Sequence, residues 1–329
     1  MTATPPRPAF AQPERSVLEW LLDSDPSIRW QALRDLTDVP GPQVASERGR
    51  VATEGLGAKL LSLQGPDGSW GGTAWNRGWD STMHVLSLLR EMGLDPAGEP
   101  ARRAVQRVVD GVRWQGWDWD GAWRGKEFVG NPFFAGEVEP CINGQVGASA
   151  AYFGQDLSRV LDWLLRGQLE DGGWNCEAEN GSTRSSFNTT ICVLEALLEY
   201  ELAGGTRAGV REARLRGQEY LLERRLLRRK STGDLIERAW SRFSFPNWWH
   251  YDVLRGLDYM RKVAVVPDDR LREAVELVAS KRGSDGRWLL ENQYPGTMPV
   301  DLGEAQGHPS RWITLRALRV LKWYSAEGG

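Results

Sequence analysis

The chain has 329 residues, of which 41% are apolar, and a formal net charge of −3. This charge gives no indication of a nucleic-acid partner, and an odd number of cysteines, three, excludes a full disulfide framework. Since no apolar run is long enough to span a membrane, we expect a soluble cytoplasmic protein. The 17 tryptophans are unusual beside 7 tyrosines and 8 phenylalanines.

Three regions are predicted in chain order. Residues 1–14 are rich in Pro and Ala and have no apolar signal-peptide core, so we expect a flexible tail. Residues 15–40 carry apolar residues at helical spacing and predict a helical hairpin packed on the remainder. Residues 41–329 are expected to form the main body.

A D-G-x-W motif recurs along this body. Its tryptophans are Trp70, Trp123, Trp174 and Trp288, at successive separations of 53, 51 and 114 residues. Because 114 is two steps of 57, a fifth unit is expected near residue 230, where the motif is lost. Gln64 and Gln168 each precede the motif's Trp by six residues. Such a period predicts a stacked array of similar units.

Each unit predicts two helices separated by the motif. The first helix is amphipathic and is expected at Val51–Leu63, Asp156–Arg166 and Asp269–Arg282. The second is more apolar and is expected at Ser81–Met92, Ile142–Phe153, Ser186–Tyr200, Trp249–Lys262 and Trp312–Tyr324. A single pair cannot bury its apolar faces, so the pairs must pack on one another.

The motif segments Leu60–Gly71 and Leu164–Trp174 resemble the QW repeats of squalene–hopene cyclases, and weaker forms mark protein prenyltransferase β subunits. This resemblance implies an all-α (α/α) toroid of five to six helix pairs. The more apolar helices would form the inner ring around a deep aromatic cavity. The repeat's Gln and Trp would have a structural role.

Asp80 is a candidate catalytic acid. When residues 78–82 are compared with the D-x-D-D-T motif of squalene cyclases, Asp80 matches the middle acid of the motif. Gly78 and Ser81 stand where the flanking acids would be. The alternative is that Asp80 caps the following helix.

A second candidate site is a zinc site. Protein prenyltransferases bind zinc with a D-x-C pair and a His, which here correspond to Glu139, Cys141 and Asn188. Asn is a poor zinc ligand, so His250 is expected to supply the nitrogen, with Asp252 as a further carboxylate. The alternatives are a buried structural Cys141 and a hydrogen-bonded core His250.

Further candidates lie at the expected starts of inner helices, where aromatic faces can stabilise a cation. With Asp80, we expect His250 and Asp252 to be catalytic. The expected substrate-binding residues are Trp79, Asn143, Asn188, Trp248, Trp249, Tyr251, Arg311 and Trp312. The thiol and two carboxylates of the loop Cys176–Asn180 could act in acid–base chemistry at the cavity mouth, but we expect this loop to be solvated surface. The basic run Arg224–Lys230 could bind a diphosphate, but we expect it to end an outer helix.

Together these features predict an isoprenoid-processing enzyme that acts on an apolar polyene or prenylated small molecule by acid–base chemistry. Two alternatives remain open. One is a non-catalytic toroid that binds a lipid or a partner, and the other is a metal-assisted enzyme of another reaction type. The oligomeric state is not predicted.

Overall fold

The computed structural model describes residues 13–116, 124–125, 127–263 and 266–325. Within them the chain is all-α, apart from a short antiparallel pair of strands, β1 (Arg113–Gln115) and β2 (Val129–Pro132). Twelve helices alternate between an outer and an inner position, and α3 (Gly41–Gly49) is additional. The outer helices are α1 (Arg15–Leu22), α4 (Gly55–Ser62), α6 (Glu99–Gly111), α8 (Ser158–Arg166), α10 (Val210–Leu222) and α12 (Arg272–Ser280). The inner helices are α2 (Pro26–Leu36), α5 (Thr82–Met92), α7 (Pro140–Tyr152), α9 (Phe187–Leu202), α11 (Val253–Val263) and α13 (Arg311–Ser325).

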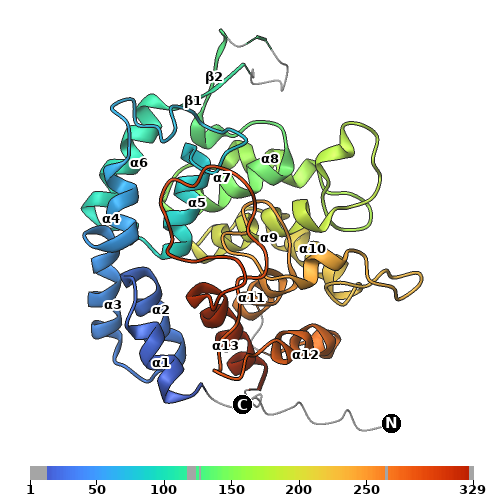
Figure 1. The fold of residues 1–329 in the computed structure, drawn as a ribbon. Helices are drawn as coiled ribbons and strands as arrows, with labels where there is room; N and C mark the ends of the chain where they lie inside the picture. The colour runs from blue at the N-terminus through green and yellow to red at the C-terminus, as the bar shows by residue number, and fades with distance from the viewer. Residues whose placement is uncertain (1–12, 117–123, 126, 264–265, 326–329) are drawn as a thin grey trace.

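The inner helices form a closed ring, α5–α7–α9–α11–α13–α2, seen nearly end-on in Figure 1. The ring closes through α2, which packs on α13 and is hydrogen-bonded to the end of α5. There the Trp30 indole donates to Met92 O (2.8 Å) and Gln31 Nε2 donates to Glu91 O (3.1 Å). The α1–α2 hairpin therefore stands in the place of a sixth pair.

Three pairs, α4–α5, α8–α9 and α12–α13, are each joined by a segment that we call a Trp turn, built around a buried tryptophan. The indoles of Trp70, Trp174 and Trp288 each donate, at 2.7 Å, to the carbonyl ten residues earlier in the outer helix. Their backbone N–H groups donate to the hydroxyls of Thr82, Thr190 and Thr314 on the inner helix. One residue thus fixes the end of one helix and the start of the next. Trp123 lies outside the described residues.

The repeat glutamines link neighbouring pairs. Gln64 Nε2 donates to Gly68 O within its turn and to Ala104 O on the next outer helix, both at 2.8 Å. Gln168 makes the equivalent bonds to Gly172 O (2.7 Å) and Ala213 O (2.8 Å). The Gly of the motif has positive φ and lies against that next helix, where a Cβ on Gly68 would come within 2.1 Å of Arg107 O. Only Gly satisfies both conditions.

The fifth unit, near residue 230, lacks the D-G-x-W motif and is held by different residues. In place of an indole, the Tyr251 hydroxyl donates to Leu226 O at 2.8 Å. Helix α11 begins at Val253, so the prediction that it starts at Trp249 is wrong. Trp248 has φ of +53°, and Asp252 Oδ1 accepts from Arg255 N at 2.8 Å, which caps the helix after an irregular segment.

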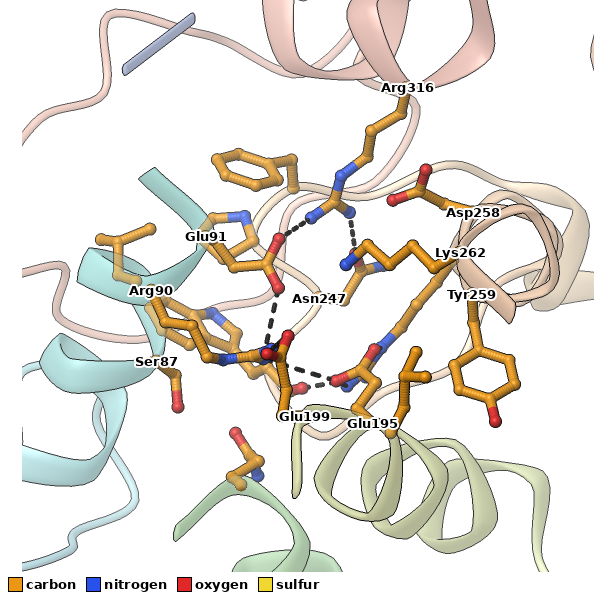
Figure 2. Close-up of a pocket in the computed structure, with 17 residues that line it drawn as sticks. Ser87, Arg90, Glu91, Glu195, Glu199, Asn247, Asp258, Tyr259, Lys262 and Arg316 are labelled. Atoms are coloured by element: carbon orange, nitrogen blue, oxygen red, sulfur yellow. Dashed lines mark hydrogen bonds and ion pairs between the residues drawn. The ribbon is translucent and has the colours of Figure 1, made fainter. Parts of the chain in front are cut away.

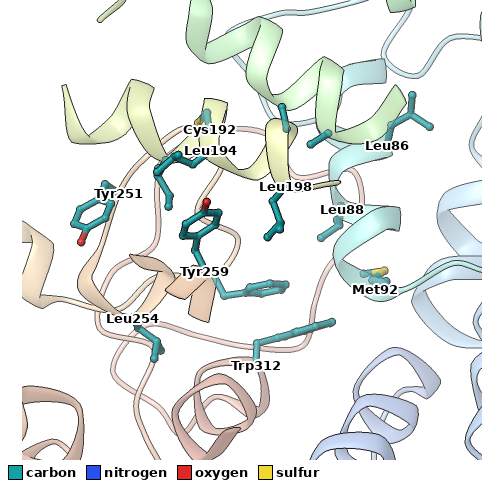
Figure 3. Packing of buried hydrophobic residues seen from close by; sticks show 14 of the residues in the cluster. Leu86, Leu88, Met92, Cys192, Leu194, Leu198, Tyr251, Leu254, Tyr259 and Trp312 are labelled. Carbon is teal, nitrogen blue, oxygen red and sulfur yellow. The ribbon is translucent and has the colours of Figure 1, made fainter. Parts of the chain in front are cut away.

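Apolar side chains of α5, α9, α11 and α13 meet between the helices, as Figure 3 shows for Leu88, Leu198, Tyr259 and Trp312. Helices α7 and α9 approach most closely, because α7 has glycines on the contact face. A Cβ on Gly144 would lie 2.6 Å from the backbone of Cys192. None of the helices in the described ranges is long and apolar enough to cross a membrane.

The Trp turn can be tested at Thr190, whose hydroxyl accepts the buried N–H of Trp174. Thr190→Val keeps the side-chain shape and leaves that N–H without a partner, so we expect a loss of about 1–3 kcal/mol in the free energy of unfolding. Urea denaturation would measure it. Thr206→Val, at an exposed position, is the control. Equal stability of the two variants would contradict the role given to this hydroxyl.

Candidate functional site

A cavity of about 600 Å³ lies at the end of the ring where the inner helices begin. Its volume is typical of small-molecule sites. Its lining comes from the loops before α5, α7, α9 and α11, the first turns of α7 and α9, and the loop between α12 and α13. The lining residues are Trp75, Arg77, Trp79, Glu139, Cys141, Ile142, Gln145, Asn175, Cys176, Ser186, Asn188, Thr189, Trp249, His250, Tyr294 and Pro295.

One wall of the cavity is aromatic. Trp79 stacks on Trp248 with ring centroids 5.1 Å apart and an interplanar angle of 9°. Its indole donates to Pro295 O at 3.0 Å, in the long loop between α12 and α13 that crosses in front of α5 and α7 in Figure 1. Gly296 allows this approach, since a Cβ there would lie 2.3 Å from the Trp79 indole nitrogen. The loop therefore holds the Trp79 ring in place.

His250 lies between two rings of this wall. Its imidazole stacks on Trp249 and on Tyr294, with centroid distances of 3.6 Å to each. Burial and, to a lesser extent, the Arg255 guanidinium together lower the pKa of His250 to about 4. The ring is consequently neutral at neutral pH, and one of its two nitrogens carries no proton.

Another part of the lining carries two thiols and a carboxylate. Cys141 Sγ lies 2.8 Å from Cys176 Sγ and 3.8 Å from Glu139 Oε2. The ligand atoms of all three residues lie within 4.8 Å of one another. The Thr189 hydroxyl is 3.5 Å from Cys176 Sγ. His250 does not belong to this group, so the structure brings Cys141 together with Cys176 and not, as expected, with His250.

Local structure explains how residues 35 positions apart meet here. Pro140 starts α7 immediately before Cys141, and glycines let α7 approach α9. Cys176 lies in a short 3-10 turn, Cys176–Ala178, capped by the Asn175 side chain, which accepts from Glu177 N at 2.9 Å. The preceding Trp174 is fixed by its Trp turn. Cys176 is therefore held beside α7 and is not the solvated surface residue that the sequence suggested.

A buried carboxyl lies behind this wall. Glu137 is 4% exposed, and its carboxyl accepts from Glu139 N at 2.6 Å. Burial, with a smaller contribution from the charge of Glu139, raises the pKa of Glu137 to about 8. Asn143, predicted to bind substrate, instead holds this segment by bonding both the N–H and the C=O of Glu137, at 2.9 Å each.

Other predicted residues lie outside the cavity lining. The Asp80 carboxylate accepts from Asn76 Nδ2 at 2.8 Å, and the N-cap of α5 is Ser81, so Asp80 is neither a lining residue nor the helix cap. Asp252 is buried and accepts from Ser244 N and Asn247 Nδ2. Both carboxylates are engaged within the protein.

The same holds for three candidates for substrate binding. Arg311 faces α1, where its guanidinium donates to Trp20 O (3.3 Å) and lies over the Trp20 ring (4.6 Å). Trp312 stacks on Phe245 at 4.2 Å, and Tyr251 is buried against Phe187. The basic run begins after α10 has ended at Leu222, so it does not lie in that helix's last turn.

Of the predicted residues, those that line the cavity are Trp79, Glu139, Cys141, Asn188, Trp249 and His250. Asn188 also accepts from Tyr251 N at 2.7 Å. Sequence reasoning missed Trp75, Arg77 and Tyr294, and it assigned Cys176 to solvated surface. The signal for Cys176 was its position two residues after the motif's Trp, since that Trp is fixed in the fold.

The centre of the ring is filled by ion pairs, which Figure 2 shows between the inner helices. Arg255 forms a two-point bond with Glu195 (2.8 Å each), and Arg316 donates to Glu91 (2.7 Å). Arg90 donates to Glu199 at 3.2 Å. The expectation of a deep aromatic cavity at the centre is therefore wrong, because charged side chains occupy that depth and confine the cavity to one end.

The network continues to the closing helices. Arg319 donates to both oxygens of Asp258, at 2.8 and 2.6 Å, and to Gln31 on α2 at 3.0 Å. Although burial would raise the pKa of Asp258, Arg319 and Arg261 hold it well below its usual value.

A smaller cavity, of about 300 Å³, lies beside Phe245, Trp248 and the loop between α12 and α13. Tyr294 lines both this cavity and the larger one. Its ring therefore stands between the two spaces.

No protein-family model and no curated protein matches the chain. Among solved structures, the chain is similar to a protein from Actinoplanes, with 16% identity over 92% of this chain and 91% of that chain, at a TM-score of 0.44. It is also similar to the type II terpene cyclase MstE from Scytonema, with 16% identity over 93% and 86% of the two chains, at a TM-score of 0.45. A variant of that cyclase in complex with geranylgeranyl dihydroxybenzoate is 17% identical, over 94% of this chain and 86% of that chain, at a TM-score of 0.43. Activity must be argued from the site itself.

The central ion pairs can be tested at Asp258. Asp258→Asn removes the charge that faces Arg319, which is 6% exposed, and we expect a loss of about 3–5 kcal/mol in unfolding free energy. Chemical denaturation would measure this loss. Glu19→Gln breaks the exposed pair with Arg15 and should change stability by less than about 1 kcal/mol. A similar effect of both changes would contradict a structural role of the network.

His84 makes stability depend on pH. Its ring is fully buried and packs edge-on against the stacked rings of Trp79 and Trp248, with Nδ1 2.8 Å from Ser81 Oγ. Burial lowers the pKa of His84 to about 4, against the attraction of Asp80. The unfolded chain, with a pKa of about 6.5, binds the proton more readily.

Stability should therefore fall as the pH drops from about 6.5 toward 4, and the contribution of His84 at pH 5 is a loss of about 2 kcal/mol. His84→Gln should remove this part of the pH dependence in urea denaturation at pH 7.5 and pH 5. His308→Gln, at an exposed position, should leave it unchanged. Parallel pH profiles of His84→Gln and the parent protein would contradict the assignment.

Proposed function

We propose that the chain is an isoprenoid-processing enzyme that binds an apolar polyene or prenylated small molecule in the 600 Å³ cavity and acts on it by acid–base chemistry. The observation that carries this proposal is the neutral imidazole of His250, stacked between Trp249 and Tyr294 in the cavity wall. The resemblance of the Trp turns to QW repeats supports the same class of substrate.

The aromatic wall suits a ligand that develops positive charge. Trp79, Trp249 and Tyr294 border one space, and the π-face of such a ring attracts a cation. No lysine lies among the described lining residues, and Arg77 is exposed at the rim. Positive charge on a carbon skeleton would therefore meet rings instead of a buried ammonium group.

Proton transfer would fall to groups that face this space. His250, neutral at neutral pH, would accept a proton from the charged skeleton. Glu139 is the carboxylate among the described lining residues, and we propose it as the second proton-handling group in place of Asp80. Asp80 is bonded to Asn76 outside the lining.

Tyr294 would set the length of the ligand. The larger cavity holds the reacting part, and a longer chain could extend into the 300 Å³ cavity only if the Tyr294 ring moved aside. The second space is bordered by Phe245, Leu290, Met298 and Val300, which suit an apolar chain.

The proposal predicts turnover of a prenylated or polyene compound. The purified protein would be offered farnesyl, geranylgeranyl and squalene-type substrates, with products analysed by mass spectrometry. His250→Ala should lower the rate by roughly 10²-fold or more, as expected for loss of a positioned base. Glu139→Gln should also lower it, and Asp80→Asn should have little effect.

His308→Ala is the matched control, since His308 is exposed and lies outside the cavity. Unchanged turnover in His250→Ala would remove the assigned base, and loss of turnover in Asp80→Asn alone would return the acid role to Asp80. Binding of a lipid without any product would instead favour the second candidate, a non-catalytic binding module. The ionic centre of the ring fits that candidate, because it limits the depth available to a ligand.

A further inference from the structure

We propose that Glu139, Cys141 and Cys176 form a binding site for a thiophilic divalent cation of the zinc class. Their ligand atoms lie within 4.8 Å of one another, on two neighbouring segments of the cavity wall. Two sulfurs and a carboxylate oxygen form a donor set typical of zinc. The proposal goes beyond the isoprenoid function and does not depend on the identity of the organic ligand.

The two thiols are already arranged as a pair. Their contact lowers the pKa of Cys176 and raises that of Cys141, so one sulfur of the pair carries the negative charge more readily. A cation binds the thiolate form, and its binding releases the remaining thiol proton to solvent. The geometry of the cluster, and not this equilibrium, defines the site.

The two sulfurs would have to separate slightly to hold a metal. Two Zn–S bonds of about 2.3 Å at a tetrahedral angle place the sulfurs about 3.8 Å apart, so the 2.8 Å separation would have to grow by about 1 Å. A disulfide would need a change in the opposite direction, an approach of about 0.75 Å to about 2.05 Å. Glu139 Oε2, at 3.8 Å from Cys141 Sγ, is already at the distance of a shared ligand shell.

The surroundings leave one coordination position open. Two other polar residues of the lining already have partners: Asn188 Oδ1 accepts from Tyr251 N, and the Thr189 hydroxyl contacts Cys176 Sγ. Three protein ligands with a fourth position toward a cavity are characteristic of catalytic zinc, whereas structural zinc is closed by four protein ligands. The site would thus hold a water molecule or a donor atom at the polar end of the ligand.

This placement would orient the ligand. Its polar end would lie at Glu139, Cys141 and Cys176, and its apolar part would lie against Trp79, Trp249 and Tyr294. With a cation bound, Glu139 is a metal ligand, and proton acceptance falls to His250 alone.

The test measures metal directly. The reduced, metal-free full-length protein would be titrated with Zn²⁺ and, separately, with Co²⁺, followed by elemental analysis and by the thiolate-to-cobalt charge-transfer absorption. We expect about one equivalent of metal per chain. Cys141→Ala and Cys176→Ala should each weaken binding by at least about 10-fold and diminish the charge-transfer band, and Glu139→Gln should alter the cobalt spectrum while keeping that band.

Cys192→Ala is the matched control, because Cys192 is buried on α9 and lies outside the cluster. It should retain the metal and the charge-transfer band. Binding that survives in Cys176→Ala, or the absence of a cobalt–thiolate band in the parent protein, would overturn the proposal. The proposal would also be overturned if, after reduction, Cys141 and Cys176 formed a disulfide again in the presence of the metal and no metal was bound. These readouts require no turnover, so they are independent of the proposed isoprenoid chemistry.

Discussion

The structure depends on one hydrogen bond that is repeated around the ring, from a buried indole N–H to a carbonyl near the end of an outer helix. At Trp70, Trp174 and Trp288 this bond has the same length and the same ten-residue separation. The same tryptophan's backbone N–H is bound by a threonine on the following inner helix. Because an unpaired buried N–H is costly, both helix boundaries are fixed together. The inner helices therefore begin at one level, and their starts surround one space.

The ion pairs at the centre of the ring follow from the position of the inner helices. Each is enclosed by its two inner neighbours and by its outer partner, so the face that would be solvated on an isolated amphipathic helix is also buried. Arginines and carboxylates on that face must pair with one another across the centre, since an unpaired buried charge is strongly unfavourable. Arg255 with Glu195 and Arg319 with Asp258 meet this requirement. The result is a polar centre and an aromatic cavity restricted to one end.

The sequence predicted the features that repeat and missed those that depend on pairing between distant segments. The Gln64 and Gln168 side chains, the Trp turns and the alternation of helices follow from local spacing, and the structure confirms the all-α class. The partner of Cys141 could not be inferred, because Cys176 lies 35 residues away and reaches it only through the close packing of α7 on α9. The central ion pairs were equally inaccessible, since periodicity shows which residues are polar but not which of them face each other. Asp80 was misplaced for a related reason: its motif position was matched, but Asn76 engages its side chain locally.

Closure of the ring by α2 has a consequence for the order in which the molecule assembles. Arg319 on α13 contacts Gln31 on α2 across 288 residues of chain, so the first inner helix receives its second neighbour only after the last inner helix is available. Contacts of such long sequence separation form slowly, because the intervening chain must be brought together first. Until then the face of α2 that packs against α13 in the closed ring is exposed. An incomplete ring is an arc with two complementary ends, and two such arcs on separate molecules could join each other before either closes on itself.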